Sequence, residues 1–363
     1  MGEVPTAKPA PSPQEVAMRS PLPPREGISA TRLRAPGGKQ TSAKAHLPVP
    51  ETVEAWLAQE FPDHSPQDRA WLSEHPNGGC LTDETGRPAG PDDPVMPGGF
   101  YFFHRPVPHE DPVPFDLTVL YEDRDIVVVD KPHFLASTPN GRFVRQSAVT
   151  RLRIELNEPD LVAVHRLDRV TAGLLLFSRR PETRGAYQVL FQNRRVHKTY
   201  RALAWLPDDF DSDALPAVRR TRLHKTKGDR QVVEISGAPN TGTRLRFEGV
   251  RGRVARRLPP DSAPVVGPEA SLPNHEAELT SIGEFALEPV TGKTHQLRVH
   301  LNGLGVPMVG DPVYPADWAP DPYDFSDPLQ LVADGLRFTD PLSGKEREFQ
   351  SNFPLSLPTG LAR

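Results

Sequence analysis

The sequence predicts an α+β fold whose central sheet is largely antiparallel. Short runs rich in β-branched and aromatic residues follow one another through brief polar turns, as strands of successive hairpins do. Helical periodicity is confined to a few segments, too few to alternate with the strands as a doubly wound parallel sheet requires. We therefore expect one large domain of this kind, preceded by a small α+β module.

The N-terminal part consists of two segments that differ in composition and in apolar periodicity. Residues 1–45 are rich in Pro, Ala, Ser, Gly and basic residues and lack apolar periodicity, so we expect a disordered extension. Residues 46–111 are expected to form the small module. Its predicted elements are a helix with Val53, Trp56, Leu57 and Phe61 on one face, a helical turn over 68–74, and short apolar pieces at 80–81 and 100–103.

Residues 112–363 carry the predicted sheet. "LTVLYEDRDIVVVDKP" gives two strands around a polar turn at 122–125, and further strands are expected at 161–164, 173–178, 199–205, 231–235, 243–247, 284–290 and 336–339. Helices are expected in "SAVTRLRIELN", in "ETRGAYQVLFQNRR" and in "THQLRVHLNGLG", where Thr294 is the candidate N-cap. Residues 258–275 read as an exposed loop.

Charge is distributed unevenly along the chain. The net charge is only −4, but residues 51–111 hold 12 acidic and 3 basic residues. Residues 142–202 hold 13 basic and 5 acidic residues, and residues 217–257 hold 12 basic and 3 acidic residues. One basic stretch would fit a solvated face, but two in one chain favour a polyanionic partner such as nucleic acid.

Several kinds of chemistry are disfavoured. Cys80 is the only cysteine, which excludes a disulfide framework and fits a reducing compartment. Neither a signal peptide nor an apolar run of membrane-spanning length is visible, so we expect a cytoplasmic protein without membrane contact. We also expect a monomer. The "TGKT" at 291–294 is not a phosphate loop, because Leu287 stands where that loop needs glycine. His295 and His300 lie five residues apart, off a common helical face, and we expect neither a metal nor a cofactor.

Three residues with reactive or charged side chains remain. Asp168 lies in "VHRLDRVTAG" between apolar runs, where a carboxylate is costly unless an arginine keeps it ionised. It is either a reactive group or one half of an ion pair that fixes a turn. Tyr200 of "KTY" is either a platform for a planar ligand or a core aromatic residue. Arg298 of "GKTHQLRVH" lies in the first turns of a predicted helix, where an exposed helical arginine is the plainest interpretation.

Taken together, these segments resemble a known family. "HRLDRVTAGLLLFS" resembles the central motif of the RluA family of pseudouridine synthases, "DKP" at 130–132 resembles its first motif, and "KTY" and "GKTHQLRVHL" resemble its later motifs. The resemblance covers roughly residues 112–350. One departure is that His133 and Phe134 stand where the family commonly has a glycine.

The resemblance implies a pseudouridine synthase fold, with helices flanking the sheet and an active-site cleft, and a reaction that consumes no cofactor. It implies that Asp168 is the catalytic carboxylate, acting as nucleophile or as base, and that Arg298 is its ion-pair partner. Tyr200 would stack on the uracil and could take the proton from carbon 5, while Leu297 supplies an apolar wall. Contacts to the RNA are expected from His165, Arg166, Arg169, Lys198 and His295, with Arg166 and Arg169 facing the RNA.

The implied substrate is RNA, with ribosomal RNA expected and transfer RNA as the second candidate. The alternative is a non-catalytic RNA-binding or ribosome-assembly protein on the same scaffold. Residues 51–111 lie where many relatives carry a small RNA-binding module, but their acidic balance argues against a surface that grips phosphates. We therefore expect at most a degenerate version of that module.

Overall fold

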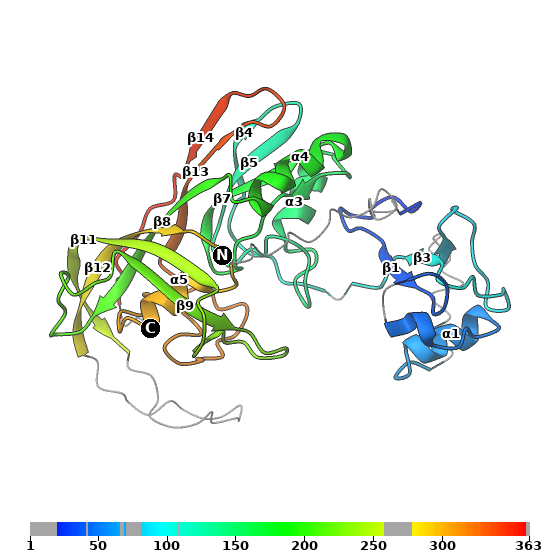
Figure 1. Ribbon diagram of the computed structural model, residues 1–363, viewed down its shortest axis with the longest axis horizontal. Coiled ribbons are helices and arrows are strands. Elements are labelled where there is room, and N and C mark those ends of the chain that lie inside the picture. Colours follow the sequence, from blue (N-terminus) through cyan, green and yellow to red (C-terminus); the bar gives the residue numbers. More distant parts are fainter. Residues whose placement is uncertain are drawn as a thin grey trace, which may run out of the picture. The chain divides into compact units, whose positions relative to one another are not determined.

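The computed structural model describes residues 20–40, 43–65, 69, 81–107, 109–257 and 278–360. The chain divides into two compact units, Met1–Pro108 and His109–Arg363 (Figure 1). Apart from residue 69, the helical turn predicted at 68–74 lies outside the described residues, as does the loop predicted at 258–275. Within the described part of the chain, no helix is long and apolar enough to cross a membrane.

The first unit packs one helix against a small sheet. Its strands are β1 (Thr31–Arg34), β2 (Thr82–Asp83) and β3 (Phe100–Phe103), in the order β1-β3-β2 and all antiparallel. A 3-10 helix spans Ala43–His46, and α1 spans Val53–Glu60. As predicted, α1 buries Val53, Trp56 and Leu57, which pack with Tyr101 and Phe103 of β3.

The prediction of disorder over residues 1–45 is wrong for Thr31–Arg34. This segment forms β1, and its register with β3 runs from Thr31 opposite Phe103 to Arg34 opposite Phe100. Pairing with β3 satisfies the backbone hydrogen bonds of β1, although this segment is polar and is flanked by turn-forming residues. Since the pairing partner lies almost seventy residues further on, local composition gave no sign of it.

The boundary between the units lies slightly earlier than the predicted 111/112. Glu110 is buried in the second unit, where its carboxylate accepts hydrogen bonds from the backbone amides of residues 144–146, at 2.8–2.9 Å. This carboxylate holds in place the loop that leads into the next helix. Residues 109–111 therefore belong to the sheet domain.

The second unit is built on one large mixed sheet (Figure 1). The order β10-β9-β11-β12-β8-β13-β7-β5-β4 is antiparallel throughout except for β13 beside β7, while β14 pairs with β13 and β6 with β7. The strands are β4 (Thr118–Glu122), β5 (Ile126–Lys131), β6 (Val162–Ala163), β7 (Ala172–Ser178), β8 (His197–Leu206), β9 (Val218–His224), β10 (Val233–Ile235), β11 (Thr241–Arg256), β12 (Glu278–Pro289), β13 (Leu331–Thr339) and β14 (Glu346–Gln350). This confirms the predicted α+β class with a mostly antiparallel sheet.

Helices cover both faces of the sheet around β5 and β7. Alternate residues of β5 point to opposite faces, so Val127 and Val129 share a core with α3 (Ala148–Glu155), whereas Ile126 and Val128 share one with α4 (Pro181–Gln192). Burial on both sides explains why β5 and β7 are continuous apolar runs. By contrast, β9 and β14 are rich in charged residues and half exposed, and the sequence does not predict them.

A glycine allows the parallel contact between β7 and β13. Gly173 has a φ of 107°, and a Cβ on it would stand 2.3 Å from the backbone oxygen of Ala333. Only glycine tolerates both this conformation and this approach. The close contact fixes the start of β7 directly after the turn that carries Asp168.

The last helix, α5 (Gln296–Asn302), lies against β9, β11 and β12. His300 of α5 is fully buried, and its Nδ1 lies 2.9 Å from Thr243 Oγ1. Its Nε2 lies 3.0 Å from Thr221 Oγ1 and 3.1 Å from Thr241 Oγ1. Burial lowers the pKa of His300 to about 4, with the positive charge of Arg219 as a smaller cause, so the ring is neutral at pH 7.

We predict that His300 makes the fold sensitive to acid. Its contribution to the free energy of unfolding is present above its unfolded pKa and is lost as the pH falls towards its lowered folded pKa, by about 2 kcal/mol between pH 7 and pH 5. Urea unfolding of the wild type and of His300→Asn at both pH values tests this. The variant should be less stable at pH 7 and should lose about 2 kcal/mol less on acidification; an identical pH dependence would contradict the assignment.

Candidate active site

One cleft of about 1500 Å³ gathers the predicted site residues. It lies over the turn between β6 and β7, the start of β8 and the loop that leads into α5. All nine residues singled out from the sequence line it: Asp168, Tyr200, Arg298, His165, Arg166, Arg169, Leu297, Lys198 and His295.

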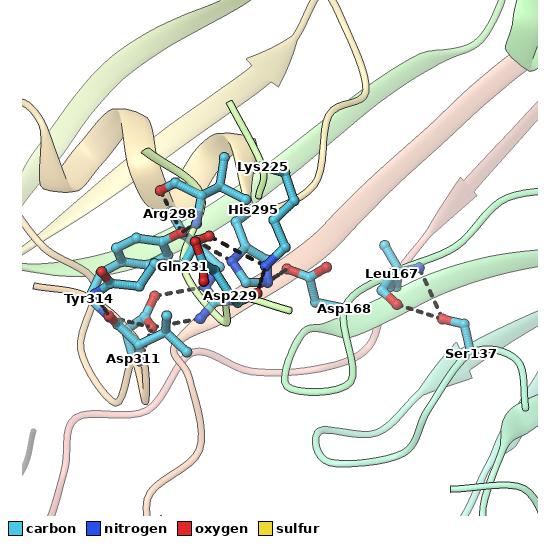
Figure 2. A network of polar contacts seen from close by, with 12 residues as sticks. Ser137, Leu167, Asp168, Lys225, Asp229, Gln231, His295, Arg298, Asp311 and Tyr314 are labelled. Atoms are coloured by element: carbon cyan, nitrogen blue, oxygen red, sulfur yellow. Dashed lines mark hydrogen bonds and ion pairs between the residues drawn. The ribbon is translucent and has the colours of Figure 1, made fainter. Parts of the chain in front are cut away.

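The turn that carries Asp168 is held by backbone contacts. The amide of Thr171 donates to the Asp168 backbone oxygen at 3.1 Å. Beside it, Ser137 braces Leu167 twice: its Oγ donates to the Leu167 oxygen at 2.8 Å and accepts from the Leu167 amide at 2.9 Å (Figure 2). The side chain of Asp168 remains 29% exposed, so it is braced by its neighbours yet open to the cleft.

The Asp168 carboxylate is held through one oxygen. Arg298 Nη1 donates to Asp168 Oδ2 at 3.2 Å (Figure 2). Among the described residues, Oδ1 has no hydrogen-bond partner. Arg298 is only 2% exposed, which excludes the interpretation as an exposed helical arginine. The adjacent arginines at 166 and 169 do not pair with Asp168.

Arg298 is itself anchored by Asp311, which the sequence did not reveal. Its Nε and Nη2 donate to the two oxygens of Asp311 at 2.8 and 2.7 Å, a bidentate pair. Burial opposes the charge, but the carboxylates of Asp311 and Asp168 raise the pKa of Arg298 above its usual value. Asp311 Oδ1 also accepts from the amides of Val313 and Tyr314. The only local sign was a Gly-Asp-Pro turn after an apolar run, which many loops share.

The loop before α5 places His295 beside this ion pair. His295 has a φ of 55° and is the residue that precedes the helix, so the predicted N-cap Thr294 is wrong. Instead, the side-chain oxygen of Gln296 accepts from the Lys293 amide at 3.1 Å and from Thr291 Oγ1 at 2.7 Å, which folds the loop back onto the helix.

His295 is held next to Asp168 without bonding to it. Its Nδ1 lies 3.1 Å from the Tyr314 hydroxyl, and its Nε2 lies 3.9 Å from Asp168 Oδ2, too far for a hydrogen bond. Burial and the charge of Arg298 lower the pKa of His295 to about 4. Tyr314 is fixed in turn by Val232, whose backbone amide donates to the Tyr314 hydroxyl at 2.7 Å. Figure 2 labels Tyr314 and the preceding residue Gln231.

Tyr200 and Leu297 form the apolar side of the cleft. Both pack against the main core, Leu297 at 7% exposure and Tyr200 as a partly buried residue at its edge. Burial and the negative charge of Asp168 raise the pKa of Tyr200, so its hydroxyl is protonated at neutral pH. The tyrosine thus offers the cleft a flat ring beside the carboxylate rather than a proton acceptor.

His165 and Arg166 differ in what they offer a ligand. His165 Nε2 accepts from the Leu176 amide at 3.2 Å, and its ring stacks on Phe191 at 4.6 Å. Burial, with the charge of Lys198, lowers the pKa of His165 to about 3, so it carries no charge for a phosphate at pH 7. Arg166 is exposed, and none of the described residues pairs with it.

Arg169 does not face the cleft freely, contrary to expectation. Its Nη1 donates to the backbone oxygens of Phe134 and Pro322, both at 3.1 Å, and its guanidinium lies 4.7 Å from the ring centre of Phe143. It therefore ties three loops together. The interaction arises between segments distant in sequence, which is why a local motif could not indicate it.

Phe134 lies in the stretch after "DKP" in which the family resemblance led us to expect a glycine. Its φ is 66°, a left-handed conformation that costs a side chain about 1 kcal/mol or more. Its ring is 5% exposed and packs on Phe325 at 5.3 Å and Phe115 at 6.1 Å. Burial of the ring among these aromatic residues offsets the backbone strain at Phe134.

The charge lining the cleft is strongly positive. Among the described lining residues there are eight arginines and two lysines but only two carboxylates, Asp168 and Glu288. No group of three His, Cys, Asp or Glu side chains within the described residues is arranged as a metal site. The cleft therefore suits a polyanion, with one carboxylate at its centre.

Comparison with known proteins identifies the family. A family model described as RNA pseudouridylate synthase matches residues 125–303. The dual-specificity RNA pseudouridine synthase RluA of Vibrio cholerae is 32% identical over 228 residues, which is 62% of this chain and 79% of that protein. The chain belongs to the RluA family of RNA pseudouridine synthases. The resemblance inferred from four short motifs is thereby confirmed, and the protein is an enzyme rather than a binding protein alone.

Two further proteins resemble this pseudouridine synthase at lower identity. The tRNA pseudouridine(31) synthase of Saccharomyces cerevisiae is 29% identical over 198 residues, or 54% of this chain and 46% of that protein. The structure of human RNA pseudouridylate synthase domain containing 1 superposes with a TM-score of 0.46 at 21% identity, covering 66% of this chain and 84% of that one.

We predict that Asp311→Asn impairs both stability and activity. The change removes one of two carboxylates from a buried guanidinium, which should lower the free energy of unfolding by roughly 2–4 kcal/mol. Loss of the bidentate pair should also let Arg298 move away from Asp168, which should slow pseudouridine formation by about 100-fold. Urea unfolding and a single-turnover assay measure the two effects. Asp209→Asn, at an exposed site, is the matched control, and wild-type rates in Asp311→Asn would refute the anchoring role.

We predict that Phe134→Gly destabilises the enzyme although it relieves the left-handed backbone strain at this position. Losing the buried ring should cost about 3–5 kcal/mol, and relief of the left-handed strain should return about 1–2 kcal/mol. The net loss in the free energy of unfolding is roughly 1–4 kcal/mol, measurable by urea titration. A variant as stable as the wild type would show that the aromatic cluster contributes nothing.

Proposed function

We propose that this enzyme isomerises specific uridines of ribosomal RNA, with Asp168 as its catalytic carboxylate. The observation that carries the proposal is the state of that carboxylate in the cleft: Oδ2 is held by Arg298, while none of the described residues donates a hydrogen bond to Oδ1. Transfer RNA is the second candidate substrate, favoured by the yeast relative, whose name assigns it to tRNA.

The proposed reaction moves the ribose from one atom of the base to another. The bond between N1 and C1′ breaks, the uracil turns, and a bond between C5 and C1′ forms; C5 loses a proton and N1 gains one. Asp168 Oδ1 would act either as the nucleophile at C1′ or as the base that starts glycal formation. Arg298 keeps the carboxylate charged and oriented, because its other donors are committed to Asp311.

Tyr200 is proposed to stack on the uracil after the nucleotide has left its helix or loop. Flipping is needed because the reacting bond is hidden in a stacked base. The raised pKa of Tyr200 disfavours a role as the base that removes the proton from C5. Leu297 closes the apolar side, and His295 would present its neutral ring at the far edge of Asp168.

Phosphate contacts are assigned to the cleft and not to the acidic N-terminal unit. Among the described lining residues, the cations without a protein partner are Arg142, Arg166, Arg194, Arg195, Lys198 and Lys293. Such unpaired cations favour an RNA whose bases are exposed in a loop. We further propose that the enzyme acts in the cytoplasm, because a single cysteine fits a reducing compartment. We also propose that it acts as a monomer.

The test is to map pseudouridine in unmodified ribosomal and transfer RNA after incubation with the enzyme. Wild type should modify a small set of uridines. Asp168→Asn should lower the rate by at least about a thousandfold while RNA affinity stays within about threefold, because the shape of the side chain is kept and its charge is lost.

Asp209→Asn serves again as the control for an exposed aspartate. Equal rates in wild type and Asp168→Asn would refute the assignment of Asp168. Modification of transfer RNA alone would refute the proposed substrate and leave the chemistry standing.

A further inference from the structure

Lys198 is a half-buried cation in the cleft wall that no described residue neutralises. It lies on β8, and its side chain lines the cleft. No hydrogen bond or ion pair joins its ammonium to any described residue. Burial lowers the pKa of Lys198 below its usual value. A partly desolvated charge without a partner is costly, so the position favours an anion supplied by the ligand.

The carboxylates nearby are already engaged. Asp168 is held by Arg298 at 3.2 Å. Glu288 lies 3.5 Å from His197 Nε2 and 3.9 Å from Arg244 Nη1. Since these are the two carboxylates among the described lining residues, this part of the cleft offers Lys198 no anion.

The space beside the ammonium is left open by a glycine. A Cβ built on Gly292 would stand 3.8 Å from Lys198 Nζ, an ordinary van der Waals contact, so a side chain at 292 would take up space beside the ammonium. Glycine at 292 therefore preserves room for a group of the ligand.

The position of Lys198 relative to Tyr200 indicates which group that is. The two residues are separated by one position on β8, so both point to the same face, about 7 Å apart along the strand. This spacing is comparable to the distance between the base and the phosphate of one nucleotide. A uracil on Tyr200 would place a phosphate of the same nucleotide at Lys198.

We propose that Lys198 Nζ binds a non-bridging oxygen of a phosphate that flanks the target uridine, while the uracil of that nucleotide rests on Tyr200. The proposal rests on the proposed function of Tyr200 and Asp168 and adds the group that seats the flipped nucleotide. Arg166, Arg194 and Arg195 are exposed and lie at the rim, where they suit phosphates further along the RNA.

The test uses Lys198→Met, Lys198→Arg and, as a control outside the cleft, Lys345→Met. The RNA is a stem-loop in which the wild type forms pseudouridine, prepared with all phosphates charged or with a neutral methylphosphonate at one linkage beside the target uridine. Lys198→Met should raise KM and Kd about tenfold, leave kcat within about threefold, and reduce the slope of log K against log salt by about 0.7–0.9. Lys198→Arg and Lys345→Met should stay near wild type.

The neutral linkage isolates the contact itself. At one of the two flanking positions it should weaken the wild type about tenfold and leave Lys198→Met unaffected. Equal weakening of both proteins at both positions would overturn the proposal, as would a fall in kcat at unchanged KM, which would place Lys198 in the chemistry.

If the wild type forms no pseudouridine in any RNA, the proposed function fails. The affinity for fluorescent oligouridylate, measured at several salt concentrations, still tests whether Lys198 binds a phosphate. Equal slopes of log K against log salt for wild type and Lys198→Met would overturn that proposal.

Discussion

The site depends on a single buried guanidinium. Arg298 is 2% exposed and lies between two carboxylates, Asp311 on one side and Asp168 on the other. A buried cation is stable only when carboxylates and hydrogen bonds compensate its charge. The Arg298 site therefore requires three segments to meet at one point: the start of α5, the turn after Met308, and the turn between β6 and β7. One guanidinium facing two carboxylates leaves one negative charge in excess, and Asp168, whose Oδ1 has no hydrogen-bond partner among the described residues, carries it in the lining of the cleft.

The sheet supplies the rigidity that this arrangement requires. Gly173 lets β7 approach β13 closely just after the Asp168 turn, and Ser137 clamps the residue before it. Lys131, fully buried, donates to the backbone oxygens of Leu135 and Arg169 and so joins the first-motif loop to the same turn. Around this fixed anion the cleft is cationic, which attracts RNA without neutralising the carboxylate, because the free cations do not reach it.

Elements formed by local interactions could be predicted from the sequence, whereas contacts between distant segments could not. Buried strands such as β5 and β7 have apolar runs that identify them, and Asp168, Tyr200 and Arg298 stand in motifs that a resemblance could recognise. Asp311 stands in an ordinary turn, and β1 gains its structure from a strand almost seventy residues away. Arg169 shares a motif with Asp168 but is used to tie loops, since its role is fixed by Phe134 and Pro322 from other parts of the chain.

The most direct measurement is a crystal structure of the enzyme bound to an RNA that carries its target uridine. The account predicts that Asp168 Oδ1 faces C1′ of the flipped nucleotide within contact distance, while Arg298 still bridges Asp168 Oδ2 and Asp311. A complex in which the Asp168 carboxylate lies away from that ribose, or in which Arg298 has left Asp311 to bind the RNA, would contradict it.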